Sequence, residues 1–320
     1  MRHNILITGG FGLLGKPLTL KLINLKHNVF ILEKKNTKRL KFLSKKPKKI
    51  IAGNFINKNL VAKVIKENNI DVVFHLGAIT QVLDSLKKPY ETHLTNIIGT
   101  VNFLENIRTI NKKIIFIYSS SDKAYGELKN KKEYKEGDSL DSTYPYDVSK
   151  SSSDLICQSY SKTYSMKVGI IRCANIYGPG DFNLKRLIPE VILSTIENKN
   201  FVIRSDGKST RDYVFVEDVV EAYLKLFRKL KSSKDNLKIY NVSSKFNYSV
   251  LEIVKMILKK MNNTKLMPII LNNSKQELNF QRLNYSKIQR QLGWRPKTDI
   301  GKGIKETINW YVKFYNFLKK

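Results

Sequence analysis

Short apolar runs alternate along the first half of the chain with longer segments in which apolar residues recur every three or four positions. The short runs are rich in Ile, Val, Leu and Phe, which is typical of strands buried on both faces of a parallel sheet. The longer segments have the period of helices that cover such a sheet. Together they predict an α/β fold with a doubly wound parallel sheet. The expected strands are 4–8, 29–33, 49–52, 71–76, 113–118 and 167–172, and the expected helices are 16–25, 57–68, 88–110 and one that starts near Tyr146.

The pattern changes after about residue 177, where Pro179, Gly180 and Pro189 interrupt the alternation. We interpret the rest of the chain as a smaller, mixed α/β domain packed over the sheet. Because the sequence has no internal repeat and no low-complexity linker, we expect the two parts to be closely docked. The expected domains are 1–177, with a return segment near 212–243, and 178–320. The expected helices here are 186–198, 216–230, 249–261 and 301–318, with a loop-rich stretch at 262–275 and a short helix that ends at Gly293-Trp294-Arg295-Pro296.

The 320 residues include 58 Lys and Arg against 27 Asp and Glu, which gives a formal net charge of +31. A charge of this size would suit nucleic acid, an anionic membrane surface or a phosphorylated substrate. Most of the excess is lysine scattered through nearly every segment, and no long helix has a dense basic stripe. We therefore interpret most of the charge as solvated surface, with a nucleic-acid-binding protein as a remote alternative.

Three further features favour a cytoplasmic protein. Cys157 and Cys173 lack the spacing of metal ligands and fit a reducing compartment, so no metal site is expected. The N-terminus passes directly into an apolar strand and a glycine turn, without the pattern of a signal peptide. No apolar run reaches the roughly 18 residues that a membrane-spanning helix needs.

Gly9, Gly12 and Gly15 form a Gly-x-x-Gly-x-x-Gly turn between the first expected strand and the first expected helix. Glycines at this spacing allow a tight turn and let the backbone approach a pyrophosphate at the helix N-terminus. Glu33, at the end of the next strand, can accept hydrogen bonds from ribose hydroxyls and would repel a 2′-phosphate. The turn therefore predicts a Rossmann-type site for NAD rather than NADP; a glycine turn that only packs a helix on a sheet is the alternative.

The stretch 118–150 holds a hydroxyl, a carboxylate, an amine and a phenol that could converge. Tyr146 and Lys150 stand four residues apart, so they share one face of the expected helix. An ammonium beside a phenol lowers the pKa of the phenol, which would make Tyr146 a usable base near neutral pH. Taken alone, the two residues also fit an ordinary half-exposed helical pair.

With these motifs the chain resembles the extended short-chain dehydrogenase/reductases, and within them the nucleotide-sugar epimerase and dehydratase family. The triplet Ser121-Asp122-Lys123, with the later Tyr-Pro-Tyr-Asp-Val-Ser-Lys, is most similar to the CDP-glucose 4,6-dehydratase branch. Two departures are Asn54, where many members carry Asp, and Gly77, where Ala is common. The resemblance covers essentially the whole chain and rests on Thr8-Gly9-Gly10-Phe11-Gly12-Leu13-Leu14-Gly15, His75-Leu76-Gly77-Ala78, Asn96-Ile97-Ile98-Gly99-Thr100, Tyr146 with Lys150, Arg172-Cys173-Ala174-Asn175-Ile176-Tyr177-Gly178-Pro179, Arg211-Asp212-Tyr213-Val214 and Leu292-Gly293-Trp294.

The resemblance implies a division of catalytic labour. Tyr146, assisted by Lys150, would take the proton of a sugar 4-hydroxyl, and Ser121 would hydrogen-bond the same oxygen. Asp122 would be the acid and Lys123 the base of a later elimination of water; an exposed turn pair is the alternative for these two residues. The implied cofactor-binding residues are Gly9, Phe11, Gly12, Leu13, Gly15, Glu33, Asn54, Phe55, Leu76, Gly77, Ala78, Tyr146 and Lys150.

For the substrate, the resemblance implies that Asn175 and Arg211 bind the phosphates of a nucleotide-diphosphate sugar, with Arg204 a weaker candidate. Arg offers a bidentate fork to phosphate oxygens, although Arg211 could instead form a structural ion pair with Asp212. Glu277 and Gln281 stand where related dehydratases have polar residues that line the base site. His75 is expected to be a structural histidine at a strand end rather than a catalyst.

The leading hypothesis is therefore an NAD-dependent nucleotide-sugar 4,6-dehydratase that acts through a 4-keto intermediate and gives an NDP-4-keto-6-deoxyhexose. A 4-epimerase or a C4 dehydrogenase of the same fold is the close alternative. Ser121, Tyr146 and Lys150 argue against a nucleic-acid-binding protein, because a binding module needs no such triad. The resemblance also implies a homodimer formed through the helix at 88–110 and the helix that starts at Tyr146.

Overall fold

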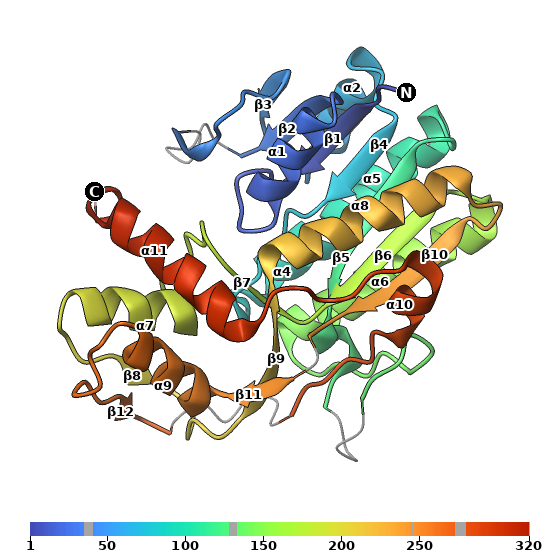
Figure 1. Cartoon of the computed structure of the whole chain (residues 1–320). Helices are drawn as coiled ribbons and strands as arrows, with labels where there is room; N and C mark the ends of the chain where they lie inside the picture. The colour runs from blue at the N-terminus through green and yellow to red at the C-terminus, as the bar shows by residue number, and fades with distance from the viewer. Residues whose placement is uncertain (35–40, 128–132, 245, 273–279, 320) are drawn as a thin grey trace.

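The central feature of the molecule is a parallel β-sheet with helices on both faces (Figure 1). The computed structural model describes residues 1–34, 41–127, 133–244, 246–272 and 280–319. Within these residues the sheet has seven strands in the order β10-β6-β5-β4-β1-β2-β3. Every neighbouring pair is parallel, which confirms the expected doubly wound α/β fold. The strands are β1 (Asn4–Thr8), β2 (Asn28–Glu33), β3 (Lys49–Ala52), β4 (Val72–His75), β5 (Ile115–Ser121), β6 (Val168–Cys173) and β10 (Leu237–Val242).

The strand order reverses between β1 and β4, which places a crevice at the carboxyl ends of these two strands. The chain winds outward from β1 to β2 and β3, then returns to the other side of β1 with β4, β5 and β6. Ligands of open α/β sheets bind at such a reversal. The glycine-rich turn after β1 and the segment with Gly77 after β4 both lie there.

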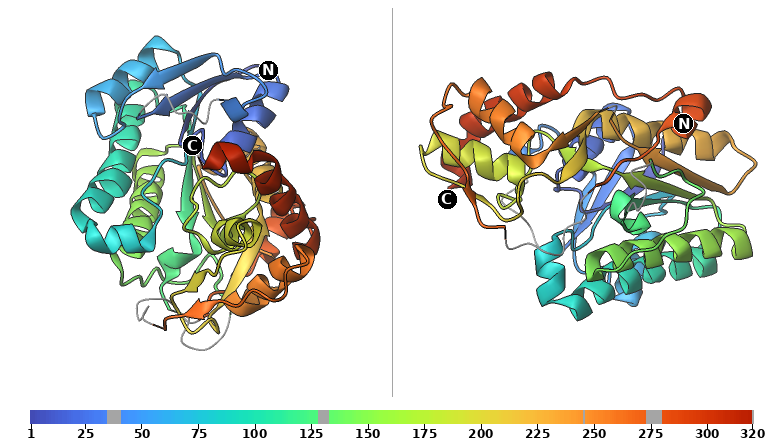
Figure 2. Two further views of the ribbon diagram at one scale, coloured as in Figure 1. Left: turned by 90° about the vertical axis from the view of Figure 1, so that its left-hand side faces the viewer. Right: turned by 90° about the horizontal axis from the view of Figure 1, so that it is seen from below.

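Successive side chains of the strands bury into two separate cores, one on each face of the sheet. Ile5 and Ile7 belong to the core beneath α1 (Gly15–Asn24) and α8 (Val216–Ser232). Leu6 belongs to the opposite core, which is covered by α2 (Lys58–Glu67), α5 (Gly99–Ile110) and α6 (Pro145–Tyr164). Figure 2 shows the resulting three layers. Because both faces of the sheet are buried, the strand sequences are continuous apolar runs and do not alternate between apolar and polar residues.

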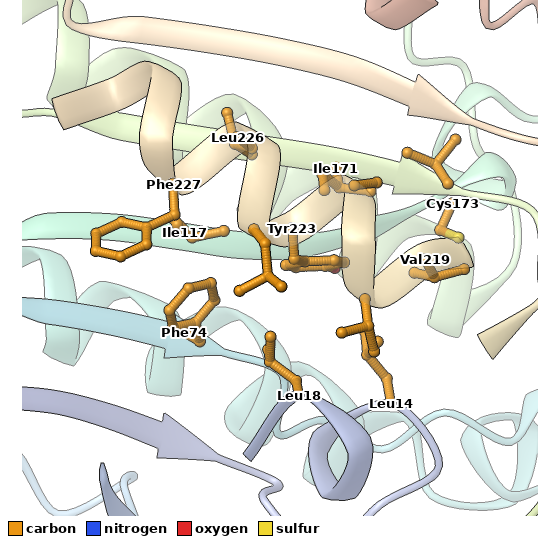
Figure 3. Packing of buried hydrophobic residues seen from close by; sticks show 14 of the residues in the cluster. Leu14, Leu18, Phe74, Ile117, Ile171, Cys173, Val219, Tyr223, Leu226 and Phe227 are labelled. Carbon is orange, nitrogen blue, oxygen red and sulfur yellow. The ribbon is translucent and has the colours of Figure 1, made fainter. Parts of the chain in front are cut away.

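Helix α8 packs its apolar stripe directly on the sheet (Figure 3). Its Tyr223 and Phe227 rings lie 6.4 and 5.9 Å from the ring of Phe74 on β4. Leu14 and Leu18, at the start of α1, fill the space beside them. Burying a large apolar side chain of this kind stabilises the fold by about 1.5–3 kcal/mol. Helix α8 is therefore part of the large sheet's core, although most strands of that sheet come much earlier in the sequence.

The second half of the chain adds a smaller group of elements around a third core. It contains a mixed sheet, β11-β9-β7, and a two-stranded sheet, β12-β8. Helices α7 (Leu187–Ile196), α9 (Val250–Lys260) and α11 (Ile300–Leu318) cover them, at the lower left of Figure 1. The expected smaller, mixed α/β part is therefore present. Its strands are β7 (Asn175–Tyr177), β8 (Val202–Ile203), β9 (Thr210–Phe215), β11 (Asn247–Ser249) and β12 (Ile269–Ile270).

The chain crosses between the two parts more than once. After β9 it returns to the large sheet as α8 and β10, within the return segment expected from the sequence. Later, α10 (Ser286–Leu292) buries Ile288 in the core under α8, and the Nε1–H of Trp294 donates to the carbonyl oxygen of Asp218 at 2.8 Å. The predicted boundary at residue 177 stays a prediction, because several later residues pack with the earlier ones.

Two local differences from the sequence-based expectation concern the site. The expected helix 88–110 is α4 (Pro89–His93), a π-helical turn η2 (Leu94–Ile98) and then α5, with α3 (Val82–Lys87) before it. Strand β5 continues three residues beyond the expected end, because Ser119, Ser120 and Ser121 pair with β6. In the described part of the chain, no helix is both long and apolar enough to span a membrane.

Candidate active site

The glycine turn after β1 has the geometry that a dinucleotide pyrophosphate requires. Gly9 has a φ of +67°, which side chains other than glycine rarely tolerate, and its carbonyl oxygen accepts the N–H of Gly12 at 3.0 Å. A Cβ at Gly15 would collide with that same carbonyl oxygen, so α1 can approach the turn only at a glycine. A Cβ at Gly12 would meet only this oxygen, at 3.3 Å, which is a tight contact but much less severe than the one at Gly15.

The start of α1 also fits an anionic group. Within the described residues no side chain caps this helix, so its first N–H groups keep the positive end of the helix dipole available to a ligand. Glu33 ends β2, and its carbonyl oxygen accepts the N–H of Gly53 at 2.8 Å. The half-buried side chain of Glu33 thus lies at the carboxyl edge next to β1. The arrangement fits the pyrophosphate and ribose of a dinucleotide.

A short polar link fixes the second glycine turn, after β4. Nδ1 of His75 lies 2.9 Å from Oγ1 of Thr8, which in turn accepts the N–H of Gly77 at 2.9 Å. Burial lowers the pKa of His75 to about 3, so this histidine is neutral. The expectation that His75 is structural is confirmed. A Cβ at Gly77 would meet the ring of Phe55 at 2.9 Å, so the unusual glycine makes room for that ring.

Several residues expected at the cofactor have side chains that are buried in the protein, which leaves only their backbone groups for a ligand. Phe11, Leu13 and Phe55 have side chains buried in the two cores, and the Phe55 ring stands edge-on to His75 at 5.1 Å. Asn54 uses Oδ1 to accept the N–H of Ile56 at 3.1 Å, which leaves its amide N–H groups as donors. The remaining expected residues of this edge, Leu76 and Ala78, are partly buried.

Tyr146 and Lys150 occupy the first two turns of α6 and are 8% and 4% exposed. Nζ of Lys150 donates to the carbonyl oxygen of Ser119 at 2.7 Å and lies 5.1 Å from the centre of the Tyr118 ring. Burial lowers the pKa of Lys150 to about 8. The two residues therefore share a helix face, as expected, but the amine is fixed by the end of β5.

The expected lowering of the Tyr146 pKa is wrong for this structure. Burial raises the pKa of Tyr146 well above its usual value, and the charge of Asp122 adds to the rise. The hydrogen bond between Tyr146 and Ser121 opposes it but is the smaller effect. Burial removes the phenolate from water, and this outweighs the opposing effects of the Ser121 hydrogen bond and the charge of Arg186.

Ser121, Asp122 and Lys123 stand where β5 runs into the 3₁₀ turn η3 (Asp122–Tyr125). The Ser121 hydroxyl donates to Oδ1 of Asp122 at 2.9 Å, and the N–H of Lys123 donates to the same oxygen at 2.8 Å. Oδ2 of Asp122 is buried and has no hydrogen-bond partner among the described residues. Burial raises the pKa of Asp122, although Lys123 and Arg211 oppose the rise. An exposed turn pair is thereby excluded for Asp122, which is 3% exposed.

The structure brings two more charged residues to the site that the sequence did not single out. Asp147, next to Tyr146, is 1% exposed, and burial raises its pKa to about 6. Arg186 acts on Tyr146 electrostatically and donates to Asp181 at 3.1 Å and to Thr80 at 3.3 Å. Asp147 lies inside the quoted tyrosine motif, so its position was a usable signal; the position of Arg186 depends on how the smaller part folds back.

Of the three residues expected to bind the substrate, Asn175 and Arg211 are buried near the site, whereas Arg204 pairs with another residue. Nδ2 of Asn175 is buried without a hydrogen-bond partner among the described residues, as a donor held for a ligand would be. Arg211 is 7% exposed and acts on both Asp122 and Asp147. Arg204 instead lies 3.7 Å from Glu190 of α7.

Asp212 and the two residues expected to line the base site, Glu277 and Gln281, come later in the sequence. Asp212 accepts hydrogen bonds from the hydroxyls of Ser243 and Ser244, so it ties β9 to the end of β10. Gln281 is fully buried, and neither polar atom of its side-chain amide has a partner within the described residues. Glu277 lies outside the described residues. Among the described residues, no group of His, Cys, Asp and Glu could hold a metal ion.

Comparisons with known proteins agree with this geometry. The family model described as GDP-mannose 4,6 dehydratase matches residues 6–307. The human dTDP-D-glucose 4,6-dehydratase is 30% identical over 326 residues, which cover 98% of this chain and 91% of the human protein. The crystal structure of the Bacillus anthracis dTDP-glucose 4,6-dehydratase in complex with NAD is 26% identical, with a TM-score of 0.87 over 99% of each chain. The Thermotoga maritima UDP-glucose 4-epimerase with UDP-glucose is also 26% identical, with a TM-score of 0.89 over 98% of this chain and 99% of the epimerase.

Proposed function

The chain belongs to the GDP-mannose 4,6-dehydratase family, and from this membership we propose that it is an NAD-dependent nucleotide-sugar 4,6-dehydratase. Its product is an NDP-4-keto-6-deoxyhexose. The observation that carries the proposal is the buried Asp122 between Ser121 and Lys123, with a free Oδ2, beside the Tyr146 and Lys150 pair. An epimerase needs the tyrosine and the lysine, whereas elimination of water also needs an acid and a base.

The glycine turn, the start of α1 and Glu33 would hold the cofactor. The backbone at Gly12 would admit the pyrophosphate, the uncapped helix N-terminus would face its charge, and Glu33 would accept hydrogen bonds from the adenosine ribose. Lys150 and Tyr146 stand at the end of the crevice where the nicotinamide belongs. A bound NAD would supply a hydride acceptor for C4 and a hydride donor for C6, and its positive charge would favour the phenolate of Tyr146.

Tyr146 removes the proton of the 4-hydroxyl, and Ser121 orients the same oxygen. The pKa of Tyr146 is raised by burial, so its ionisation depends on positive charge within the closed site. Lys150 contributes from its place beside Ser119, and its pKa of about 8 allows it to exchange protons near neutral pH. The result is a 4-ketone, which acidifies the proton on C5.

Lys123 then takes the C5 proton, and Asp122 protonates the oxygen that leaves C6. Ser121 and the N–H of Lys123 both bind Oδ1 of Asp122, so Oδ2 is the oxygen that faces the substrate. The raised pKa of Asp122 keeps a proton on this carboxyl to a higher pH than in water. Lys123 returns its proton to C5 at the end of the cycle, so it acts first as base and then as acid.

Asn175 and Arg211 bind the diphosphate of the substrate. The unpartnered Nδ2 of Asn175 supplies a buried donor, and Arg211 adds a cation beside it. Arg204 is a weaker candidate for binding the diphosphate, because its guanidinium already forms an ion pair with Glu190. The homodimer expected from the sequence is part of this proposal.

Incubation with NAD and a panel of dTDP-, UDP-, GDP- and CDP-linked hexoses tests the function directly. We expect one of them to lose a single water, which mass spectrometry of the sugar nucleotide detects. A product of unchanged mass with inverted C4 would identify a 4-epimerase instead. A product that lacks only two hydrogens, with stoichiometric reduction of NAD, would identify a C4 dehydrogenase.

A further inference from the structure

Arg172 is a buried arginine on β6 to which the mechanism above gives no role. Its side chain is 2% exposed, and its Nε and Nη2 donate to the two carboxylate oxygens of Asp154 on α6, each at 2.9 Å. Its Nη1 donates to the hydroxyl of Tyr125 at 2.9 Å and to the carbonyl oxygen of Glu136 at 3.1 Å. Tyr125 is the last residue of η3. The guanidinium of Arg172 therefore joins α6 directly to η3.

The two segments joined in this way carry different steps of the proposed reaction. Asp154 follows Lys150 by four residues and Tyr146 by eight, so the three side chains lie along one face of α6. Tyr125 ends the turn that begins at Asp122. Helix α6 thus holds the groups of C4 oxidation, whereas η3 holds those of the elimination of water.

The far end of η3 is held through both the hydroxyl and the ring of Tyr125, which is 1% exposed. The hydroxyl donates to Oδ1 of Asn241 on β10 at 2.8 Å while it accepts from Arg172. The ring stacks on that of Tyr134, with 4.6 Å between the ring centres and 8° between the planes. The hydroxyl of Tyr134 in turn donates to the carbonyl oxygen of Gly126 at 2.9 Å. Segments far apart in the sequence thus fix the end of this turn.

The ion pair between Arg172 and Asp154 supplies geometry more than stability. Removing two ions from water often costs as much as their attraction returns, so a buried pair is a weak source of stability. A bidentate contact, however, sets the plane of the guanidinium relative to the carboxylate. The guanidinium carbon lies 4.9 Å from the centre of the Tyr125 ring. One planar group therefore sets where Tyr125 stands relative to α6.

Helix α6 and η3 differ in how much they need this anchor. Helix α6 has 20 residues, and its Lys150 is also held by the carbonyl oxygen of Ser119. The turn η3 has four residues, and 3₁₀ turns have poorer hydrogen-bond geometry than α-helices. Loss of the anchor should therefore displace η3 and leave α6 in place.

We propose that Arg172, Asp154 and Tyr125 form a positioning unit that holds η3 at a fixed place relative to α6. In this arrangement Asp122 and Lys123 reach C5 and C6 of a sugar whose C4 lies at Tyr146. The inference rests on the proposed dehydratase function and adds how its two steps are kept aligned. The three residues of the unit act through η3 and α6 rather than on the sugar itself.

The first test measures the position of η3 and does not depend on activity. Tyr125→Phe keeps the stacked ring and removes only the hydroxyl, while Arg172 retains Asp154 and the carbonyl oxygen of Glu136. In hydrogen exchange followed by mass spectrometry on the protein without ligands, we expect peptides that contain η3 to exchange about tenfold faster. Peptides from α6 should stay within about twofold of wild type. Unchanged exchange in η3 would overturn the positioning unit, whether or not the protein is a dehydratase.

The second test separates the two steps of the reaction under single-turnover conditions. It uses NAD and the dTDP-, UDP-, GDP- or CDP-linked hexose that loses water in the panel above. In Tyr125→Phe we expect water loss to slow by roughly ten- to a hundredfold, because a displacement of about 1 Å can slow a reaction by that much. Reduction of NAD by C4 oxidation, followed by absorbance, should stay within about twofold, so that reduced cofactor accumulates. Equal losses in both steps would show that Tyr125 only supports the fold.

Tyr240→Phe is the matched control. Tyr240 is a fully buried tyrosine on β10, and its hydroxyl donates to Oε1 of Gln291 at 2.8 Å, away from η3. We expect it to lower the melting temperature about as much as Tyr125→Phe does, without changing the exchange of η3 or the ratio of the two steps. A selective loss of elimination in this control would contradict the proposal. A wild type that loses no water would refute the proposed function, and hydrogen exchange would still decide on the positioning unit.

Discussion

At the scale of single residues, burial changes the pKa values of the site's ionisable groups more than the neighbouring charges do. The pKa values of Tyr146, Lys150 and Asp147 all move toward the neutral form, and burial is the largest cause in each case. In a buried site of this kind charges interact strongly, so a charged group that binds there changes how easily each residue gains or loses a proton. The site is therefore suited to reactions in which protons move between fixed neighbours rather than to and from water.

Tyr146→Phe tests the proton transfer at C4. Loss of the phenol oxygen removes the base and leaves the ring packing intact, so we expect C4 oxidation to slow by on the order of 10²–10⁴-fold. The binding of NAD, measured by calorimetry, should stay within about twofold of wild type, because the glycine turn is untouched. The melting temperature controls for folding. A variant that oxidises the sugar at the wild-type rate would refute the role of Tyr146.

At the scale of elements, the glycine-rich turn at the end of β1 and the segment with Gly77 at the end of β4 pack against each other. A Cβ at Gly9 would meet the backbone of Gly77 at 3.1 Å, and Thr8 and His75 bind the two strands together beneath them. The close approach is possible only because both residues lack side chains. The crevice between β1 and β4 therefore has a fixed width before any ligand binds.

Gly12→Ala and Gly15→Ala separate the two uses of glycine in the first turn. The methyl group of Gly12→Ala would meet only the Gly9 carbonyl oxygen, at 3.3 Å, so we expect a smaller loss of stability than in Gly15→Ala and an NAD affinity lowered by about tenfold or more. The methyl group of Gly15→Ala collides with the Gly9 carbonyl, so the melting temperature should fall by roughly 2–10 °C. Differential scanning fluorimetry with and without NAD measures both. Equal melting temperatures for the two variants would contradict the packing argument.

At the scale of the whole molecule, the large sheet supplies the cofactor crevice and the smaller part supplies the far side of the site. Asn175 and Arg211 come from β7 and β9, whereas Ser121 and Tyr146 come from β5 and α6. The net charge of +31 is carried mostly by lysines outside this region, in keeping with a solvated surface. The residues that meet at the site come from opposite halves of the sequence, so the site exists only when both parts are folded and docked.

The expected homodimer can be tested on the exposed face of η2 and α6. Ile98, Leu155 and Tyr164 are 44%, 52% and 37% exposed there, and the resemblance places the dimer contact on these helices. We expect Leu155→Asp to convert a dimer into a monomer in sedimentation analysis, because it puts a charge into an apolar interface. Leu25→Asp, at a residue 42% exposed after α1, is the matched control. A monomeric wild type would contradict the expectation.

The sequence alone determined the elements whose stability is local. The helix expected at 249–261 is α9, Val250–Lys260, because Ser249 and Glu252 form a capping box and an apolar stripe follows them. The strands β1 and β2, with the glycine turn between β1 and α1, were equally readable from short-range patterns. The proposed triad of Ser121, Tyr146 and Lys150 could also be put forward from the sequence, since the motifs that carry these residues are contiguous or lie on one helix face.

Only the tertiary structure decided the features that depend on distant contacts. The strands β8 and β12 have two residues each and exist because they pair with one another across the smaller part. The raised pKa values of Tyr146 and Asp147 follow from burial, which no spacing along the chain encodes. Local sequence fixes hydrogen bonds and side-chain periods within a few residues, whereas desolvation is set by whatever the rest of the chain packs around a group.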